Sequence, residues 1–402
     1  MDGNGRDKSE EEGFLPYDIV INILKRVPVK SLIRFKTVSK QWFNLLNNPH
    51  FISQHLHHSS LHNPFLLLHR SPPPFLPSSS SSSSSSCLIS PNLLLHDPLF
   101  FQFPSPDTKI VASSNGLLCL KHFHQSFPLS LFNPATRQIH HLPLTLIHPH
   151  HSDYLGFGFS PLLNDYKVVK ISVREIYDDE GHVVIIDESR VSRVQVYSLS
   201  SGSWREIDAT NLKNLGLVST SVTANGAIYW QATISSDPDC DSVISFDIGR
   251  DVFGVLKGPP IPPPSPTSFY YIMLSVYGDK LAMFRHFIVG NFESCSIDLW
   301  VLEHSGAAGE SWSKLHSVGP FSKILYPMSI WGDEIVCREE LNREELNNEH
   351  ADEARRVETV LALFNPCNHE LKKLPAFTDE HRYVSFNYVE SLVPVNNTNH
   401  QQ

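Results

Sequence analysis

The chain has 402 residues and a formal net charge of −10 with histidine counted as neutral. This length suffices for one small and one large domain, each with a core of its own. The negative charge argues against a general nucleic-acid binder, because such proteins gain affinity mainly by neutralising phosphates. The six cysteines are scattered without a CxxC pair, which indicates reduced thiols and a cytoplasmic or nuclear protein.

The N-terminal residues 1–13 are polar and acidic and contain no apolar segment of a secretory signal. We therefore expect a disordered tail there, and a second short tail at residues 396–402. No apolar run reaches the roughly 20 residues that span a membrane, so no membrane association is expected.

Residues 14–58 hold three short helical patterns. In the first, Ile19 and Ile23 fall on one helical face, and Pro16 stands at its head, where the missing N–H costs nothing. Pro28 separates this pattern from the second one. A unit this small exposes more apolar surface than it can bury alone, so we expect it to bury the remainder against a partner.

The third pattern begins at Ser39, a good N-cap, and has Trp42 on its apolar side. Residues 14–58 also contain six lysines or arginines and one acidic residue, so the segment is positive in a negative chain. An acidic partner surface suits it, because attraction between opposite charges speeds encounter.

The same segment closely resembles an F-box, the module that docks on a Skp-type adaptor of cullin–RING ubiquitin ligases. The matching residues, in order, are Leu15-Pro16, Asp18-Ile19, Ile23-Leu24, Val29-Lys30-Ser31-Leu32, Arg34-Phe35 and Val38-Ser39-Lys40-Gln41-Trp42. The resemblance implies an acidic Skp-type adaptor as the partner. The adaptor-binding residues that it implies are Leu15, Pro16, Ile19, Ile23, Leu24, Leu32, Val38 and Trp42.

Residues 14–58 have two other interpretations. A generic three-helix cap on the following domain needs no partner. A DNA-reading helix-turn-helix explains the basic residues, but Arg34 and Lys40 do not form a long recognition stripe, and the rest of the chain is acidic.

Residues 71–91 contain SPPP and nine consecutive serines, 78–86. A tract of this kind cannot bury apolar area, so a flexible loop is expected. Because residues 65–68 before it already have the pattern of a strand, we place the domain boundary earlier, near residues 58–63. The second domain is assigned to residues 59–395.

Beyond residue 110, helical periodicity gives way to short β patterns. The sequence LFNP occurs at residues 131–134 and again at 363–366. A glycine-containing turn followed by an apolar strand occurs four times. These turns stand at Gly116, Gly226, Gly278 and Gly332. We expect each turn to lead into the innermost strand of a repeated unit.

Repetition at roughly fifty residues, with about four strands per unit, is typical of a β-propeller. The recognisable units lie near residues 115–143, 155–208, 222–260, 274–318 and 328–376. Closure of the ring needs strands from before residue 115, such as 65–68 or 93–101, in addition to the strand region 383–395. The predicted fold is a multidomain α+β chain, a three-helix F-box followed by an all-β propeller of six blades, with five or seven blades as alternatives.

The second domain resembles the F-box-associated domain that follows the F-box in a large plant family. The segments that carry this resemblance are LFNPATRQIHHLP, LGFGFSPLLNDYKVVKI, VQVYSLSSGSWREI, NGAIYW and YVSFNYVESLV. Two departures from the family are the serine tract and a charged insertion at residues 338–358. The insertion is rich in Glu and Arg at i, i+4 spacings, so we expect it to be a solvated helix within a blade loop.

No catalytic motif is recognisable, since the chain lacks GxSxG, HExxH and a P-loop. Seven of the 22 histidines fall within residues 122–151, without a cysteine or carboxylate at metal-ligand spacing. We expect these to be solvated loop histidines, and we expect neither a metal nor a cofactor. Gly156-Phe157-Gly158 is too short for a phosphate loop and is predicted to lie in an inner strand.

Aromatic residues recur at strand positions, and we interpret them as packing between blades rather than as a ligand cage. They are Tyr197, Trp204, Tyr229, Trp230, Trp300, Trp312 and Trp331. The loops of one propeller face are the expected target-binding surface, since loops vary without disturbing the packing. The candidate loops are residues 177–189, 235–241, 259–270 and 338–358.

Together these features predict a non-catalytic substrate receptor of an SCF-type (Skp–cullin–F-box) ubiquitin ligase. The F-box anchors it to the adaptor, and the propeller holds an unknown target protein near the ubiquitin-charged enzyme. Two alternatives stay open: an F-box protein that acts outside a ligase, and a propeller that senses or transforms a small ligand.

Overall fold

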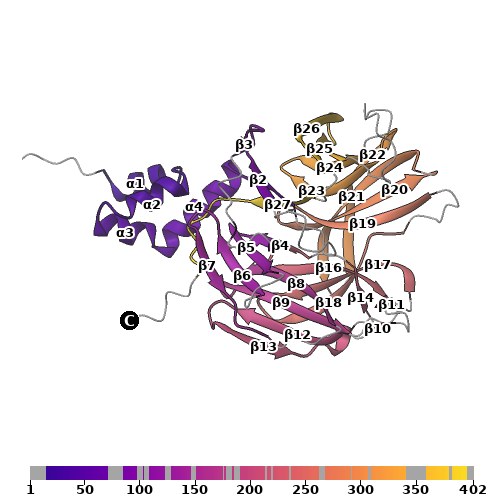
Figure 1. Cartoon of the computed structure of the whole chain (residues 1–402), viewed down its shortest axis with the longest axis horizontal. Helices are drawn as coiled ribbons and strands as arrows, with labels where there is room; N and C mark the ends of the chain where they lie inside the picture. Colours follow the sequence, from indigo (N-terminus) through magenta and orange to yellow (C-terminus); the bar gives the residue numbers. More distant parts are fainter. Residues whose placement is uncertain are drawn as a thin grey trace, which may run out of the picture.

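The computed structural model shows a small helical domain beside a ring of β-sheets (Figure 1). The predicted tails at residues 1–13 and 396–402 lie outside the residues that the structure describes. Those are residues 15–70, 85–96, 103, 108–122, 128–145, 151–174, 176–177, 183–184, 191–212, 215–218, 221–234, 237–261, 268–290, 292–306, 309–340, 359–379 and 383–395.

Four helices form the N-terminal domain, one more than predicted. They are α1 (Tyr17–Leu24), α2 (Val29–Phe35), α3 (Lys40–Leu46) and α4 (Pro49–His62). Pro16 and Pro28 immediately precede α1 and α2. The Ser39 hydroxyl accepts a hydrogen bond from Trp42 N at 3.2 Å, which confirms it as the N-cap of α3.

The additional helix, α4, runs to His62, within the region of residues 58–63 where the domain boundary was placed. The Asn48 side chain caps its first turn. Phe51 is buried in the core of the helical domain, whereas Ile52 and Leu56 pack against a core of the propeller. One helix therefore joins the two domains, which the three-helix prediction did not include.

Six antiparallel sheets follow, and they confirm the prediction of six blades. Blade 1 contains β1 (Phe65–Arg70), β2 (Ser85–Ile89), β3 (Leu95–His96) and β27 (Tyr383–Tyr388); blade 2 contains β4 (Thr108–Ser114), β5 (Leu117–His122), β6 (Leu129–Asn133) and β7 (Gln138–His141). Blade 3 contains β8 (His151–Ser160), β9 (Asp165–Arg174), β12 (Val191–Ser198) and β13 (Ser203–Ile207), with the hairpin β10 (Ile176–Tyr177) and β11 (Val183–Val184) inserted between β9 and β12.

Blade 4 contains β14 (Leu215–Leu217), β15 (Val222–Ala224), β16 (Ala227–Ile234), β17 (Asp237–Asp247) and β18 (Val252–Lys257). Blade 5 contains β19 (Ser268–Tyr277), β20 (Lys280–Val289), β21 (Ser294–Gly306) and β22 (Gly309–Phe321). Blade 6 contains β23 (Leu325–Trp331), β24 (Glu334–Glu340), β25 (Thr359–Asn365) and β26 (Glu370–Asp379).

The innermost strands form a closed ring of neighbours. In order they are β27, β4, β8, β15, β19 and β23, and each contacts the next around the ring. Strand β27 completes blade 1 by pairing with β1, with Leu67 opposite Phe386. Residues 65–68 and 383–395 thus close the ring as predicted. Of the predicted stretch 93–101, Leu95–His96 form the short strand β3, and residues 97–101 lie outside the described ranges.

The glycine turns were placed wrongly within the blades. Asn115-Gly116 joins β4 to β5, and Asn225-Gly226 joins β15 to β16, so each leads into the second strand and not the innermost one. All four residues have positive φ, a conformation that Asn and Gly adopt more readily than other residues. The pattern identifies a hairpin, but which of its strands lies nearest the axis depends on how the ring closes.

Gly156 and Gly158 lie in the innermost strand β8, as predicted. A Cβ at Gly156 would stand 2.5 Å from Trp230 Cζ2, and one at Gly158 would stand 2.6 Å from Ile248 Cδ1. Both neighbours belong to blade 4. Glycine is needed here because it lets two blades approach closely near the axis.

The prediction of a loop across residues 71–91 is wrong for its C-terminal part. Ser85–Ile89 form β2, which pairs with β1. The Ser86 hydroxyl is buried and lies 2.7 Å from His69 Nδ1. The end of the serine tract therefore belongs to blade 1, while residues 71–84 lie outside the described part of the chain.

The start of the charged insertion is also part of a blade. Residues 338–340 lie in β24, where a solvated helix was predicted. Glu339 is fully buried, and its Oε1 accepts from Lys323 Nζ at 3.2 Å and from Lys373 Nζ at 3.0 Å. A buried carboxylate with two cationic partners is part of the packed blade. Residues 341–358 are outside the described ranges.

The recurring aromatics pack between blades, as predicted. Tyr197, Trp230 and Trp331 are buried. Trp204 and Trp312 are only half-buried, but their indole N–H groups donate to Pro143 O and Lys257 O, each at 2.9 Å. Both acceptors lie in the preceding blade, so the same tie between blades occurs twice.

Candidate partner-binding surfaces

The helical domain has its own apolar core. Its buried members are Leu24, Val29, Leu32, Leu46 and Phe51, with Leu392 from the C-terminal segment. Leu24 and Leu32 were predicted to bind the adaptor. The structure places both inside this core, where they support the surface above them instead of forming it.

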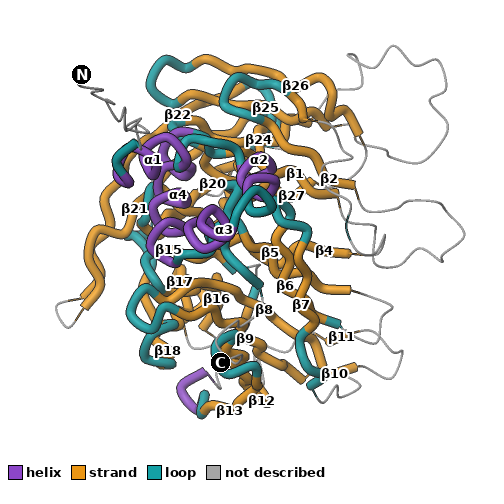
Figure 2. The backbone as a smooth tube through the Cα atoms, turned by 90° about the vertical axis from the view of Figure 1, so that its left-hand side faces the viewer, coloured by secondary structure: helices purple, strands orange, loops and turns teal. Residues whose placement is uncertain are grey.

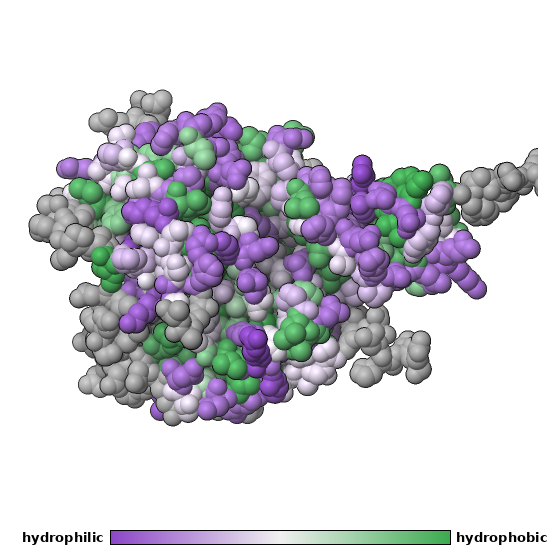
Figure 3. Space-filling view, turned by 180° about the vertical axis from the view of Figure 1, so that it is seen from behind, coloured by the Kyte–Doolittle hydropathy of each residue, from purple (hydrophilic) through white to green (hydrophobic). Residues whose placement is uncertain are grey.

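Other predicted residues are exposed on this domain. Leu15, Ile19, Ile23 and Val38 are between 44% and 69% exposed, and Pro16 is also exposed. Ile19 and Ile23 are four residues apart on α1 and therefore share one helical face. Figure 3 shows hydrophobic side chains among hydrophilic ones on the surface of the helical domain.

Trp42 is half-buried and packs edge-on against Phe35, with ring centroids 5.5 Å apart. Two exposed aromatics, Tyr17 and Phe43, were not predicted as site residues. Phe43 follows Trp42 in the sequence, but helical periodicity does not show which of the two faces a partner. We use the name α1 surface for this set of exposed residues before, on and after α1: Leu15, Pro16, Tyr17, Ile19, Ile23, Val38 and Phe43.

The helical domain is also basic. Arg26, Lys30, Arg34 and Lys40 are exposed. Lys36 is more buried, its ammonium donates to Asn47 Oδ1 at 2.6 Å, and burial lowers its pKa. Four exposed cations on a small domain with exposed apolar side chains suit an acidic partner.

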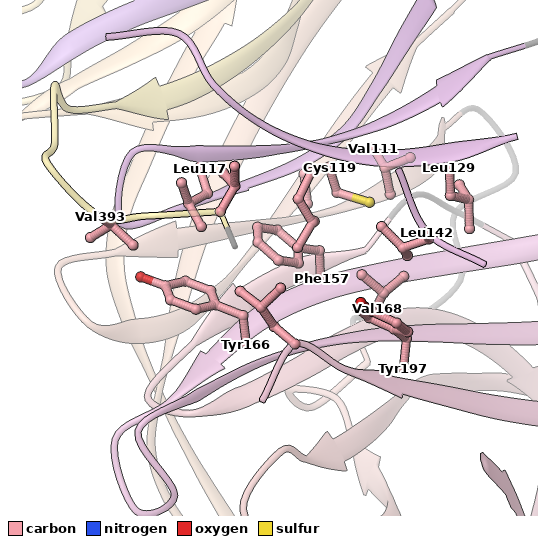
Figure 4. Packing of buried hydrophobic residues seen from close by; sticks show 14 residues of the cluster. Val111, Leu117, Cys119, Leu129, Leu142, Phe157, Tyr166, Val168, Tyr197 and Val393 are labelled. Atoms are coloured by element: carbon pink, nitrogen blue, oxygen red, sulfur yellow. The ribbon is translucent and has the colours of Figure 1, made fainter. Parts of the chain in front are cut away.

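The helical domain is attached to the propeller by the residues that follow β27. Figure 2 shows the four helices in front of the strands. Leu392 enters the helical core, while Val393 and Val395 belong to a propeller core, in which Val393 lies beside Tyr166 (Figure 4). Asn133 Nδ2 donates to Ser391 O at 3.1 Å and to Val393 O at 2.8 Å. The C-terminal segment is thus held by both domains.

The two ends of the blades carry different connections. In blades 2 to 6, short turns join the innermost strand to the second strand and the third to the fourth at one end. Ala135, in the β6–β7 turn at this end, contacts the helical core. All four candidate loops start from the opposite end, named here the loop face. Residues 237–241 and 268–270 of these loops are strand residues instead.

An exposed aromatic patch lies at the loop face of blade 5. Phe269 and Tyr271 are near the start of β19, and Phe292 lies between β20 and β21. The ring of Phe269 lies 5.4 Å from Tyr271 and 5.8 Å from Phe292, and all three are exposed. Contiguous exposed apolar side chains often mark protein-binding sites. The alternation of Phe269 and Tyr271 was the available sequence signal, and it was missed.

A buried ion pair holds the start of the candidate loop 259–270 in place, at Pro259 and Pro260. Arg285 Nε donates to Asp241 Oδ2 at 2.8 Å, and the same guanidinium donates to Pro259 O at 2.6 Å. Arg285 is almost fully buried. Residues 259–261 are therefore anchored to blade 5, which fixes the start of one candidate loop.

The histidines of residues 122–151 are not all solvated, contrary to the prediction. His122 is buried, with Nδ1 3.1 Å from Thr108 Oγ1 and Nε2 3.0 Å from Ser130 Oγ. Burial, with the nearby His141, lowers the pKa of His122. His140 Nε2 lies 2.7 Å from Tyr197 Oη. Within the described ranges, no group of three or more potential ligands could hold a metal ion.

Two family models match this chain. The F-box domain matches residues 14–54, and the F-box associated beta propeller domain matches residues 66–329. The chain belongs to the plant F-box proteins with an associated propeller domain. This agrees with the resemblance found in the sequence and with the six-bladed ring.

Arabidopsis thaliana relatives of this F-box protein match it over long stretches. The putative F-box protein At3g10430 is 28% identical over 61% of this chain and 62% of its own length. F-box protein At3g07870 is 27% identical over 79% and 77%, and F-box protein CPR1 is 27% identical over 76% and 73%. The chain thus spans about three fifths of the first relative.

Solved structures are matched only loosely by this F-box protein. A structure from a study of two prolyl endopeptidases has a TM-score of 0.34 and 13% identity, over 66% of this chain and 36% of that chain. A similarity this low supports no inference. Among the helices in the described part of the chain, none has the length and apolar character needed to cross a membrane.

Proposed function

We propose that this F-box protein is the substrate receptor of an SCF-type ubiquitin ligase, acting in the cytoplasm or nucleus. The helical domain docks on a Skp-type adaptor, and the propeller holds a target protein. The receptor makes and breaks no bonds itself. It raises the effective concentration of the target near the ubiquitin-charged enzyme.

The α1 surface is the observation that carries this proposal. A helical domain with a complete core still exposes Leu15, Ile19 and Ile23. Water-exposed side chains of this size gain about 1.5–3 kcal/mol each when fully buried, so a partner that covers them is favoured. The surrounding basic residues add electrostatic attraction for an acidic adaptor.

Adaptor affinity tests this proposal directly. Ile19→Ala with Ile23→Ala should weaken binding of a purified Skp-type adaptor at least tenfold, about 1.4 kcal/mol, measured by surface plasmon resonance. Ile261→Ala is the matched control, because Ile261 is a similarly exposed isoleucine on the propeller. Equal affinity of the double variant and the wild type would refute adaptor docking through α1.

The interior residues give a different result in the same assay. Leu24→Ala or Leu32→Ala should lower the stability of the helical domain by about 2–5 kcal/mol, because each leaves a cavity in its core. Adaptor binding then falls together with helical signal in circular dichroism. The Ile19 and Ile23 variants should lose binding without losing that signal.

Target capture is the second half of the proposal. The loop face carries the exposed aromatic patch and the four candidate loops, at the end of the propeller away from the β6–β7 turn. Phe269→Ala with Phe292→Ala should reduce the set of co-purified proteins while adaptor and cullin are still recovered. An unchanged set would place target binding elsewhere on the molecule.

A further inference from the structure

A small pocket lies near the propeller axis, at the loop face. It has a volume of about 260 Å³ and lies where blades 2, 3 and 4 meet. Lys109, Lys121, Asp153, Leu155, Val218 and Ser221 are among its lining residues. Lys109 is the second residue of β4, and Ser221 directly precedes β15. Both innermost strands begin at the loop face, so the pocket lies at that end.

Two lysines of this pocket lie on neighbouring strands. Lys109 and Lys121 stand directly opposite each other on β4 and β5, a placement that destabilises a sheet when the charges are alike. Neither ammonium has a hydrogen bond or an ion pair with any residue in the described ranges. Burial, with the charge of Lys121, lowers the pKa of Lys109. An anion between them would relieve both effects.

The carboxylate of Asp153, which also lines the pocket, already has partners. Asp153 Oδ2 lies 3.2 Å from Lys170 Nζ, and Asp153 Oδ1 accepts a hydrogen bond from Ser172 Oγ at 2.7 Å. Lys170 therefore balances Asp153. Within the described ranges, no carboxylate forms an ion pair with Lys109 or Lys121.

Ser221 gives an independent indication of a ligand. Its side chain is buried, it lines the pocket, and its hydroxyl has no hydrogen-bond partner among the residues that the structure describes. A buried polar group without a partner costs about 1–3 kcal/mol, and such groups are rare in folded proteins. A hydroxyl beside two ammonium groups is a donor set for an anion.

The size and lining of the pocket restrict the ligand further. Its volume lies just below the roughly 300–1,000 Å³ of pockets that hold drug-sized molecules. The pocket therefore has room for about one side chain. Val111, Leu155 and Val218 supply apolar wall next to the cations, which suits a charged group on an aliphatic stem.

We propose that this pocket receives one anionic side chain, a carboxylate or a phosphate, from a target segment bound across the loop face. Lys109 and Lys121 pair with the anion, and the Ser221 hydroxyl donates a hydrogen bond to it. The stem of the side chain packs against Leu155 and Val218. This inference rests on the proposed function, because it names the chemistry that the receptor recognises in its target.

Arrays of random peptides test the inference with the full chain. In each array one central residue is fixed as Glu, phosphoserine, Gln or Ser. The wild type and the control Lys257→Met, an exposed lysine on the outer strand β18, should retain anionic arrays at least tenfold better than neutral ones. Lys109→Met with Lys121→Met should lose this preference. Ser221→Ala should weaken it severalfold without lowering the melting temperature.

Each outcome of the array experiment bears on the inference. Retention of both anionic arrays shows that a carboxylate suffices, and retention of phosphoserine alone identifies phosphate as the source. No preference in the wild type, or a preference that survives in the double lysine variant, overturns the inference. The inference is also overturned if free inorganic phosphate stabilises the chain while no peptide array is retained. Adaptor affinity is measured in parallel. If the adaptor binds normally while the peptide preference is absent, this inference fails but adaptor docking stands.

Discussion

Trp230 and Trp204 were predicted to act alike, but their environments differ. Trp230 is fully buried between blades 3 and 4 and fills the space left by Gly156. Trp204 is half-buried at the blade edge and donates to Pro143 O. Trp230→Ala should cost about 3–5 kcal/mol in free energy of unfolding, and Trp204→Ala about 1–2 kcal/mol. Urea denaturation measures both, and equal losses would contradict this difference.

His69 makes the stability of the propeller dependent on pH. It is fully buried between blades 1 and 2, 2.7 Å from Ser86 Oγ and 3.0 Å from Thr108 O. Burial lowers its pKa to about 4, against about 6.5 in an unfolded chain. The unfolded state therefore binds the proton first, so stability is complete above pH 6.5 and is lost as pH falls toward 4, by up to about 3 kcal/mol.

Denaturation at several pH values checks this expectation. His69→Asn should reduce but not abolish the loss of stability between pH 6.5 and 4, because asparagine does not titrate while buried His286, whose pKa is also lowered to about 4, still does. His304→Asn, at an exposed histidine, is the matched control and should keep the wild-type pH dependence. A slope that is the same in both variants would assign the effect to other groups.

The sequence predicted part of the α1 surface and missed the rest. Leu15, Ile19 and Ile23 match a known motif and are exposed, but Leu24 belongs to the same apolar pattern and is internal. Spacing along a helix groups side chains on one face, but it does not show whether a neighbouring helix or a partner covers them. His122 was misplaced for a related reason, since its partners Thr108 and Ser130 come from neighbouring strands.

At the scale of elements, strand β27 is the closure of the ring. It pairs with β1 along its whole length and contacts both β4 and β23. A chain ending at residue 382 lacks this strand and exposes the edge of β1. We expect it to lose cooperative unfolding in urea, whereas a chain ending at Val395 keeps every contact of β27. A cooperative transition at wild-type denaturant concentration in the shorter chain would show that β27 is dispensable.

The blades were predictable because each contains a local hairpin with its own turn signal. Asn115-Gly116 and Asn225-Gly226 mark such hairpins and require positive φ. Strand β2 was not predictable in the same way, because serines give no hydrophobic alternation, and Ser86 is buried only through His69 on the neighbouring strand. The order of the strands from the axis outward was also not predictable from local sequence, because blade 1 is completed by β27 from the other end of the chain.

For the whole molecule, the C-terminal segment and helix α4 both fix the orientation of the two domains. Leu392 packs in the helical core, Val393 packs in a propeller core, and Asn133 holds the backbone on both sides of Leu392. A receptor that acts by proximity needs its target held in a fixed direction from the adaptor. We therefore expect the contacts of this segment to affect ubiquitin transfer more than they affect binding.

The repeated LFNP sequence supplies a matched pair for testing this. The side-chain oxygens of Asn133 and Asn365 both accept backbone N–H groups in the turn after their strand. In addition, Asn133 donates to Ser391 O and Val393 O. Asn133→Ala and Asn365→Ala should therefore lose similar turn contacts, but only Asn133→Ala should release the C-terminal segment.

We expect Asn133→Ala to speed amide hydrogen exchange in α4 and at residues 389–395, and to increase the radius of gyration in solution scattering. Adaptor affinity should stay within about twofold of wild type, because the α1 surface is untouched, while the rate of ubiquitin transfer to a bound target falls. Asn365→Ala should leave exchange in α4 and the radius of gyration unchanged. If the two variants behave alike, Asn133 acts only on its turn, and the domain orientation is held by apolar contacts, those of Leu392 and Val393 together with those of α4.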